Sequence, residues 1–134
     1  MIVVDTNILA HFWLPSDQSN LSDQLYQTDS QWMAPRLWKS EFRNVVSLYL
    51  RKNLIDLAEG YDIIEKAELQ MENETYQVNS VQVLYYVSKS NCSSYDCEFM
   101  SLASDLGVYL ITLDKQLLNQ FPEVAKHPEL IINS

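Results

Sequence analysis

The chain has 134 residues, of which 47% are hydrophobic, and this is enough for one domain with a sizeable core. Its 18 acidic and 9 basic residues give a net charge of -9, which argues against tight, sequence-independent binding of nucleic acid through a basic surface. Cleavage of nucleic acid is not excluded, because divalent cations can neutralise an acidic site.

Targeting and redox features favour the cytoplasm. The N-terminus has no basic region and Asp5 interrupts its apolar run, so we do not expect a signal peptide. No stretch approaches the roughly 18 apolar residues of a membrane helix, so we expect no membrane association. Cys92 and Cys97 lack a second Cys or His pair nearby, which argues against zinc and favours reduced thiols in a cytoplasmic protein.

The first elements lead to an aspartate at the end of a strand. The β-branched run 2–4 predicts a short strand, buried on both faces of a parallel sheet, with Asp5 at its carboxyl end. Ligands of open α/β sheets bind at that end of the strands. The pattern then predicts a helix over 6–13, a helix over 21–28 and a strand over 31–34.

The next predicted helix, residues 36–52, carries a carboxylate on its apolar stripe. Leu37, Val45 and Leu48 define the stripe, and Glu41 lies on it between Leu37 and Val45. Burial of an unpaired carboxylate is unfavourable by several kcal/mol. Glu41 therefore needs a cation, or must tilt out to solvent at the helix edge.

Two segments of different character follow. Asp56 is a suitable N-cap for a helix that extends to Glu72. The expected buried positions of this helix are Leu57, Tyr61, Ile64 and Leu69. Residues 73–79 are mostly polar, and residues 80–90 carry an apolar face broader than one core requires. The latter segment fits a helix or a strand, and its face suits a partner protein.

The C-terminal part contributes two more aspartates. A helix is expected over 95–106, with Asp96 in its first turn and Gly107 as its stop. Its apolar face consists of Tyr95, Phe99, Leu102, Ala103 and Leu106. The remaining predicted elements are a strand over 108–111 that leads to Asp114, a helix over 115–120 and a final strand over 130–132.

This order of elements predicts an α/β fold: a single domain, residues 1–134, with a central, mainly parallel sheet of four to five strands flanked by helices. In such a fold the four carboxylates can meet at the carboxyl edge of the sheet. Each also has a structural alternative. Asp5 and Asp114 can cap helices, Asp96 can favour the positive end of its helix, and Glu41 can be a solvated residue.

A cluster of four carboxylates would repel itself without a cation. Oxygen ligands without His or Cys suit Mg²⁺ or Mn²⁺. Such an ion can lower the pKa of a bound water and stabilise charge on a phosphodiester. The cluster therefore predicts phosphodiester hydrolysis.

Four short motifs follow one another along the chain: Val4-Asp5-Thr6-Asn7, Ser40-Glu41-Phe42, Ser94-Tyr95-Asp96 with Phe99 to Ala103, and Leu110 to Asp114. Together they resemble the PIN-domain ribonucleases, and the length and motif order resemble the VapC-type toxins of toxin–antitoxin pairs. The resemblance implies that Asp5, Glu41, Asp96 and Asp114 are catalytic ligands of Mg²⁺ or Mn²⁺, and that RNA is the substrate.

The resemblance also places Asn7, Ser94 and Thr112 in supporting positions beside these ligands, although turn and cap hydrogen bonds explain the three equally well. It further implies a homodimer that an antitoxin protein silences. Candidate contacts are the apolar face within residues 81–87 and the aromatic residues Trp13, Trp32 and Trp38, although aromatic residues are more often part of the core.

Two other functions compete with a metal-dependent endoribonuclease. The first is a non-catalytic PIN-fold module that binds RNA or protein, and retention of all four carboxylates favours the enzyme over it. The second is a phosphoacceptor receiver domain, which also gathers aspartates at strand ends. It needs an acidic pair after the first strand, whereas Asp5 is followed by Thr6 and Asn7.

Overall fold

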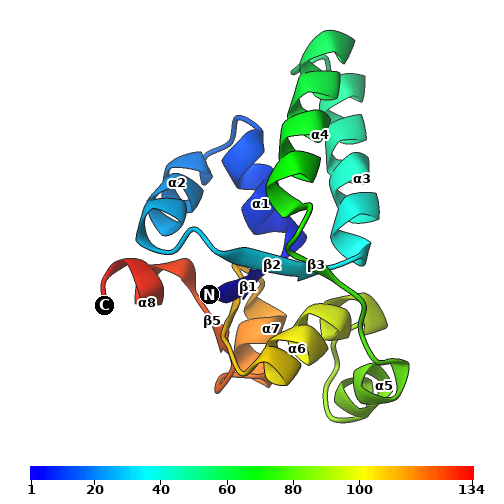
Figure 1. Ribbon diagram of the computed structural model, residues 1–134, viewed down its shortest axis with the longest axis vertical. Coiled ribbons are helices and arrows are strands. Elements are labelled where there is room, and N and C mark those ends of the chain that lie inside the picture. Colours follow the sequence, from blue (N-terminus) through cyan, green and yellow to red (C-terminus); the bar gives the residue numbers. More distant parts are fainter.

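Five parallel strands form one sheet in the order β3-β2-β1-β4-β5 in a computed structural model that describes residues 1–134 (Figure 1). The strands are β1 (Ile2–Val4), β2 (Trp32–Pro35), β3 (Thr75–Tyr76), β4 (Leu110–Ile111) and β5 (Ala125–Lys126). The predicted α/β class, with a parallel sheet flanked by helices, is confirmed.

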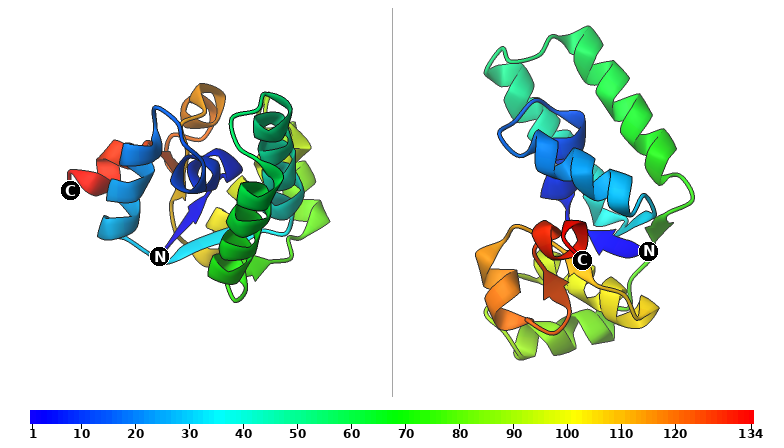
Figure 2. Two further views of the ribbon diagram at one scale, coloured as in Figure 1. Left: turned by 90° about the horizontal axis from the view of Figure 1, so that it is seen from above. Right: turned by 90° about the vertical axis from the view of Figure 1, so that its left-hand side faces the viewer.

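Helices cover both faces of this sheet. They are α1 (Thr6–Trp13), α2 (Ser19–Thr28), α3 (Leu37–Arg51), α4 (Leu57–Met71), α5 (Ser80–Ser88), α6 (Ser94–Leu106), α7 (Lys115–Gln120) and α8 (Pro128–Ile132). Helices α1 to α4 lie on one side and α5 to α7 on the other (Figure 1), and α8 packs beside α2 (Figure 2). None of the helices is both long enough and apolar enough to cross a membrane.

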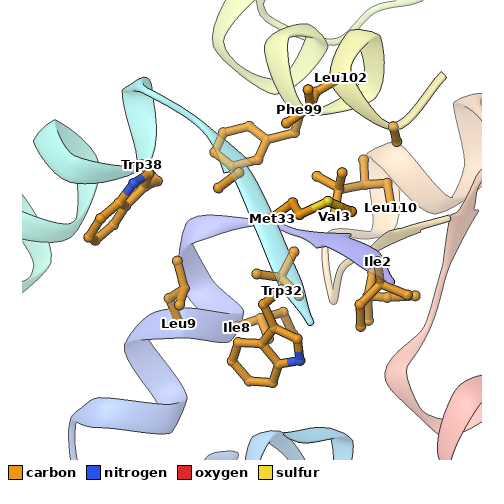
Figure 3. Close-up of a cluster of buried hydrophobic side chains, with 14 of the residues drawn as sticks. Ile2, Val3, Ile8, Leu9, Trp32, Met33, Trp38, Phe99, Leu102 and Leu110 are labelled. Atoms are coloured by element: carbon orange, nitrogen blue, oxygen red, sulfur yellow. The ribbon is translucent and has the colours of Figure 1, made fainter. Parts of the chain in front are cut away.

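Strand β1 lies at the centre of the core, between β2 and β4. Val3 pairs with Met33 on one side and with Leu110 on the other. Phe99 of α6 packs on one face of this sheet and Ile8 of α1 on the other (Figure 3). The absence of alternation in Ile2–Val4 therefore reflects burial on both faces, as predicted.

The buried face of α4 differs from the predicted one. Leu57, Tyr61 and Leu69 are each more than half exposed, so three of the four expected core positions are wrong. The buried residues are small or flexible, namely Gly60, Ala67 and Met71. The prediction assumed that the largest apolar residues of the helix are buried. In the structure, α4 instead packs against its neighbours through the face that carries the small residues Gly60 and Ala67.

The predicted final strand over 130–132 is also wrong, because these residues form α8. His127 caps this helix by accepting the Glu129 N–H at 3.2 Å, and Pro128 occupies its first turn. The fifth strand is instead Ala125–Lys126, which pairs with β4.

Strand β3 went unpredicted in the polar segment 73–79. It is held by main-chain hydrogen bonds: Ala34 N donates to the Glu74 carbonyl and Arg36 N donates to the Tyr76 carbonyl, each at 3.0 Å. A two-residue edge strand needs no apolar pattern for such bonds. Segment 80–90, which fitted a helix or a strand, contains helix α5.

Candidate active site

The carboxyl ends of β1 and β4 bring Asp5 and Thr112 together. Val4 pairs with Ile111, so the next residue of each strand emerges at the same edge of the sheet. The buried Thr112 hydroxyl donates a hydrogen bond to Asp5 Oδ2 and accepts one from Asp114 N at 3.0 Å. One threonine thus connects two of the predicted site residues.

Asp5 is both a helix cap and a site residue. Its Oδ1 accepts the Ile8 N–H at 3.1 Å at the start of α1, while its Oδ2 accepts from Thr112. The residue is only 8% exposed. Burial raises the pKa of Asp5 to about 6, and the charges of Asp114 and Asp96 add to the increase.

Glu41 reaches the same edge from α3. The buried face of this helix consists of Trp38, Phe42 and Val46, so the stripe that carries Glu41 does not face the core as predicted. Glu41 is half-buried, and its Oε1 accepts a hydrogen bond from the Thr6 hydroxyl at 2.7 Å. Burial raises the pKa of Glu41, with a smaller contribution from the charge of Asp96.

Asp96 and Asp114 each lie at the start of a helix. Asp96 is in the first turn of α6, where its N–H donates to the Ser93 hydroxyl at 3.1 Å. Burial raises the pKa of Asp96, and the charge of Asp114 contributes. Asp114 caps α7 by accepting the Leu117 N–H at 2.9 Å. The cap hydrogen bonds leave the second oxygen of the Asp114 carboxylate available.

The four carboxylates line one cavity of about 410 Å³. The other lining residues are Thr6, Asn7, Leu37, Ser40, Asn44, Val45, Tyr95 and Phe99. No Lys or Arg is among them, so nothing in the wall neutralises the acidic groups. This cavity is the candidate active site.

A family model for the PIN domain matches residues 2–126 of the chain. The chain belongs to the PIN-domain family. The family predicted from the four motifs is therefore confirmed. Residues 127–134, which contain α8, lie beyond the matched range.

This PIN domain is similar to a curated ribonuclease and to solved structures from two organisms. It is 26% identical over 129 residues to Ribonuclease VapC3 of Pyrobaculum aerophilum, across 92% of this chain and 97% of that protein. The structure is similar to PAE2754 of the same organism, with a TM-score of 0.77 and 18% identity over 98% of this chain and 93% of that one. It is also similar to FitAcB of Neisseria gonorrhoeae, with a TM-score of 0.76 and 12% identity over 96% of this chain and 99% of that one.

The supporting residues predicted for this PIN domain have different surroundings. The Thr112 hydroxyl donates a hydrogen bond to Asp5, whereas Asn7 lines the cavity and its side chain makes no hydrogen bond. Ser94 is exposed and does not line the cavity; the cap of α6 is Ser93. Thr6, whose hydroxyl donates a hydrogen bond that orients Glu41, was not among the predicted site residues. Its position next to Asp5 was the available signal.

The donors of this PIN domain suit a hard divalent cation by their chemistry. All four are carboxylates, and burial raises the pKa of three of them, Asp5, Glu41 and Asp96. The cavity wall holds no Lys or Arg that could neutralise their negative charge. No three acidic, His or Cys side chains lie close enough together to hold a metal ion in their present conformations. Binding of an ion would therefore require the side chains of the four carboxylates to move within the cavity.

Proposed function

We propose that the protein is a metal-dependent endoribonuclease that hydrolyses RNA phosphodiester bonds. The observation that carries the proposal is the convergence of four carboxylates on one cavity that no Lys or Arg lines. They come from the ends of β1 and β4 and from helices α3 and α6. Asp5, Glu41, Asp96 and Asp114 would hold Mg²⁺ or Mn²⁺. The chemistry supplied by such an ion is activation of water and stabilisation of charge on the phosphate.

Within this proposal, the hydrogen bonds around the cavity orient the carboxylates. Thr112 and the N–H of Ile8 fix the two oxygens of Asp5, and Thr6 fixes one oxygen of Glu41. Preorganised ligands need little rearrangement of their own when substrate binds. With a pKa of about 6, Asp5 is mostly ionised at neutral pH and so able to bind a cation.

RNA as substrate and a toxin role are further parts of the proposal. A relative that aligns along almost the whole chain is named as a ribonuclease of the VapC type. We propose that this protein is likewise the toxin of a toxin–antitoxin pair, acts in the cytoplasm, and is inhibited by a cognate antitoxin. We also propose that residues 1–134 form a single domain, because α8 packs against α2.

The deciding experiment is cleavage of a mixed pool of structured RNAs by purified protein with Mg²⁺, Mn²⁺ or EDTA. Asp5→Asn and Glu41→Gln remove one charge each from the cavity. Asp105→Asn and Glu65→Gln make the same chemical changes at exposed positions outside it. We expect cleavage that requires the metal, is lost in the first two variants, and is unchanged in the other two.

The opposite result has a defined meaning. If the folded protein cuts no RNA with any metal, and binds RNA equally well with and without the two substitutions, the nuclease proposal is wrong. The non-catalytic binding module would then be the better description.

A homodimer is the last part of the proposal, and α5 offers a surface for it. Val81, Leu84 and Tyr85 are each more than half exposed on this helix. An apolar patch of this kind is typical of an interface between proteins. We expect the sedimentation mass to correspond to two chains and to fall to one chain in Leu84→Glu. An unchanged mass in this variant would exclude α5 from the interface.

A further inference from the structure

The cavity has an apolar part that the proposed hydrolysis does not explain. Leu37 and Val45 of α3, together with Tyr95 and Phe99 of α6, line it beside the carboxylates. Carboxylates and a cation account for recognition of a phosphate. An apolar wall instead fits the flat face of a nucleobase.

Tyr95 differs from the other apolar lining residues in its exposure. It is 59% exposed, whereas Phe99, one turn later on α6, is 2% exposed and packs onto the sheet (Figure 3). The Tyr95 ring makes none of the ring-to-ring contacts that hold the other aromatic clusters, and its hydroxyl makes no hydrogen bond. The ring is therefore free on the rim of the cavity, although α6 fixes its backbone.

The Tyr95 ring lies close to the proposed site of cleavage. Tyr95 directly precedes Asp96, and both residues line the cavity. A base that rests on the ring would belong to a nucleotide adjoining the phosphate at the carboxylates. The apolar contact also supplies affinity that the cavity cannot obtain from basic residues, since none lines it.

We propose that Tyr95 is a specificity-determining residue that stacks on an unpaired RNA base next to the scissile phosphate. This inference rests on the proposed ribonuclease function. A base inside a duplex has both faces covered by its neighbours, so stacking on Tyr95 selects RNA that is single-stranded at the cleavage point. Stacking is tolerant of sequence because every base has a π-face.

The experiment uses oligoribonucleotides that carry 2-aminopurine, whose fluorescence falls when it stacks. Binding is measured without cleavage, in EDTA and in Ca²⁺, and kcat and KM are then measured with Mg²⁺ or Mn²⁺. The variants are Tyr95→Ala, Tyr95→Phe and Tyr95→Trp. Tyr61→Ala is the matched control, because Tyr61 is 61% exposed and lies on α4 outside the cavity.

We expect Tyr95→Ala to bind the single strand about 5- to 100-fold more weakly, with loss of quenching and a rise in KM larger than the fall in kcat. The Phe and Trp variants should retain quenching, Tyr61→Ala should match the wild type, and a blunt duplex should resist cleavage. Thermal unfolding of each variant checks that it is folded.

Three results would overturn the inference. The first is that Tyr95→Ala binds RNA as tightly as the wild type and has the same KM. The second is that Tyr95→Phe loses as much affinity as Tyr95→Ala, and the third is that duplex and single strand are cleaved equally. Failure of the ribonuclease proposal is distinguishable from these. In that case the wild type cuts no RNA, while quenching of a bound oligonucleotide still reports on Tyr95. Absence of both cleavage and binding would reject both proposals.

Discussion

At the scale of single residues, the Asp5 carboxylate destabilises the metal-free fold. Its pKa is about 6 in the folded protein against an ordinary value of 3.8. Below about pH 4 the group is protonated in both states and has no effect, and above about pH 6 it is ionised in both states and the full penalty applies. A difference of about two pKa units corresponds to roughly 3 kcal/mol.

Asp5→Asn should therefore stabilise the protein in EDTA at pH 7.5, by up to about 3 kcal/mol. The gain should shrink as the pH falls through the window between 6 and 3.8, because the wild-type carboxyl becomes neutral. Urea unfolding of both proteins at pH 7.5 and 4.5 measures the difference. A gain independent of pH, or a similar gain in the exposed control Asp105→Asn, would contradict the assignment.

Thr112 offers a second test, because its hydroxyl serves Asp5 and the Asp114 N–H together. Thr112→Val keeps the shape but leaves that N–H without its partner, so we expect a loss of about 1–3 kcal/mol in the free energy of unfolding and a lower kcat. Thr112→Ser retains the hydroxyl and should recover most of both. Equal behaviour of Val and Ser in unfolding and cleavage assays would show that the hydroxyl is unimportant.

The residue scale also shows what sequence reasoning can separate. Asp5 and Asp114 were each open to two interpretations, a helix cap or a site residue, and the structure shows that each is a cap that also lines the cavity. The interpretations were not exclusive, because a carboxylate has two oxygens. Partners such as Thr6 and Thr112 depend on the mutual placement of distant elements, which a local pattern does not contain.

At the scale of elements, the existence of most helices was predictable, and so was the buried face of α6 with Phe99, Leu102 and Ala103, while the buried faces of α3 and α4 were not. Helix α1 has its predicted bounds, and Asp56 caps α4 as expected, with Glu59 completing a capping box. These features depend on local hydrogen bonds. The buried face depends on which neighbour approaches, so Val46 of α3 packs inward while Val45 lines the cavity.

The two glycines test two different features: Gly60 lies at the α3–α4 contact, and Gly107 is the left-handed C-cap of α6. A Cβ on Gly60 would lie 3.6 Å from Leu50 Cδ2 and 3.7 Å from Val46 Cγ1, which are ordinary contacts. Gly60→Ala should therefore stabilise the protein by about 1 kcal/mol through helix propensity. Gly107 has a φ of 67°, so Gly107→Ala should cost about 1–2 kcal/mol despite open space around it. Chemical denaturation measures both changes, and destabilisation by Gly60→Ala would mean that α3 and α4 pack more tightly than described.

At the scale of the whole molecule, parallel topology was predictable because apolar strands alternate with helices. The two strands at the edges of the sheet could not be predicted. Strands β3 and β5 have two residues each and pair through the backbone, so they carry no hydrophobic period. The placement of Asp5 and Asp114 at one edge could be predicted because both follow strands of the central sheet, which the strongest apolar runs define. Glu41 and Asp96 reach the same cavity from helices α3 and α6, so their convergence depends on how these helices pack.

The charge of the whole molecule sets a limit on how it can hold RNA. Four of the nine basic residues are already engaged: Lys39 with Glu68, Lys66 with Asp62, Lys89 over Tyr85 and Lys126 over Tyr109. None of the nine lines the cavity. Five others remain, but because no basic residue lines the cavity we expect a strand bound there to contact only about two phosphates, and single-strand binding weakens with salt in proportion to that number.

Affinity for a single-stranded oligonucleotide should consequently fall less than about tenfold between roughly 50 and 200 mM KCl, whereas a protein with 6–10 phosphate contacts loses about 10³–10⁵-fold on duplex DNA. Asp5→Asn in EDTA is suitable for this titration, since it excludes cleavage and competition from divalent ions. A decline of a thousandfold would show that basic residues outside the cavity track the RNA backbone. A shallow decline, combined with weaker binding in Tyr95→Ala, would show that stacking holds the RNA where charge does not.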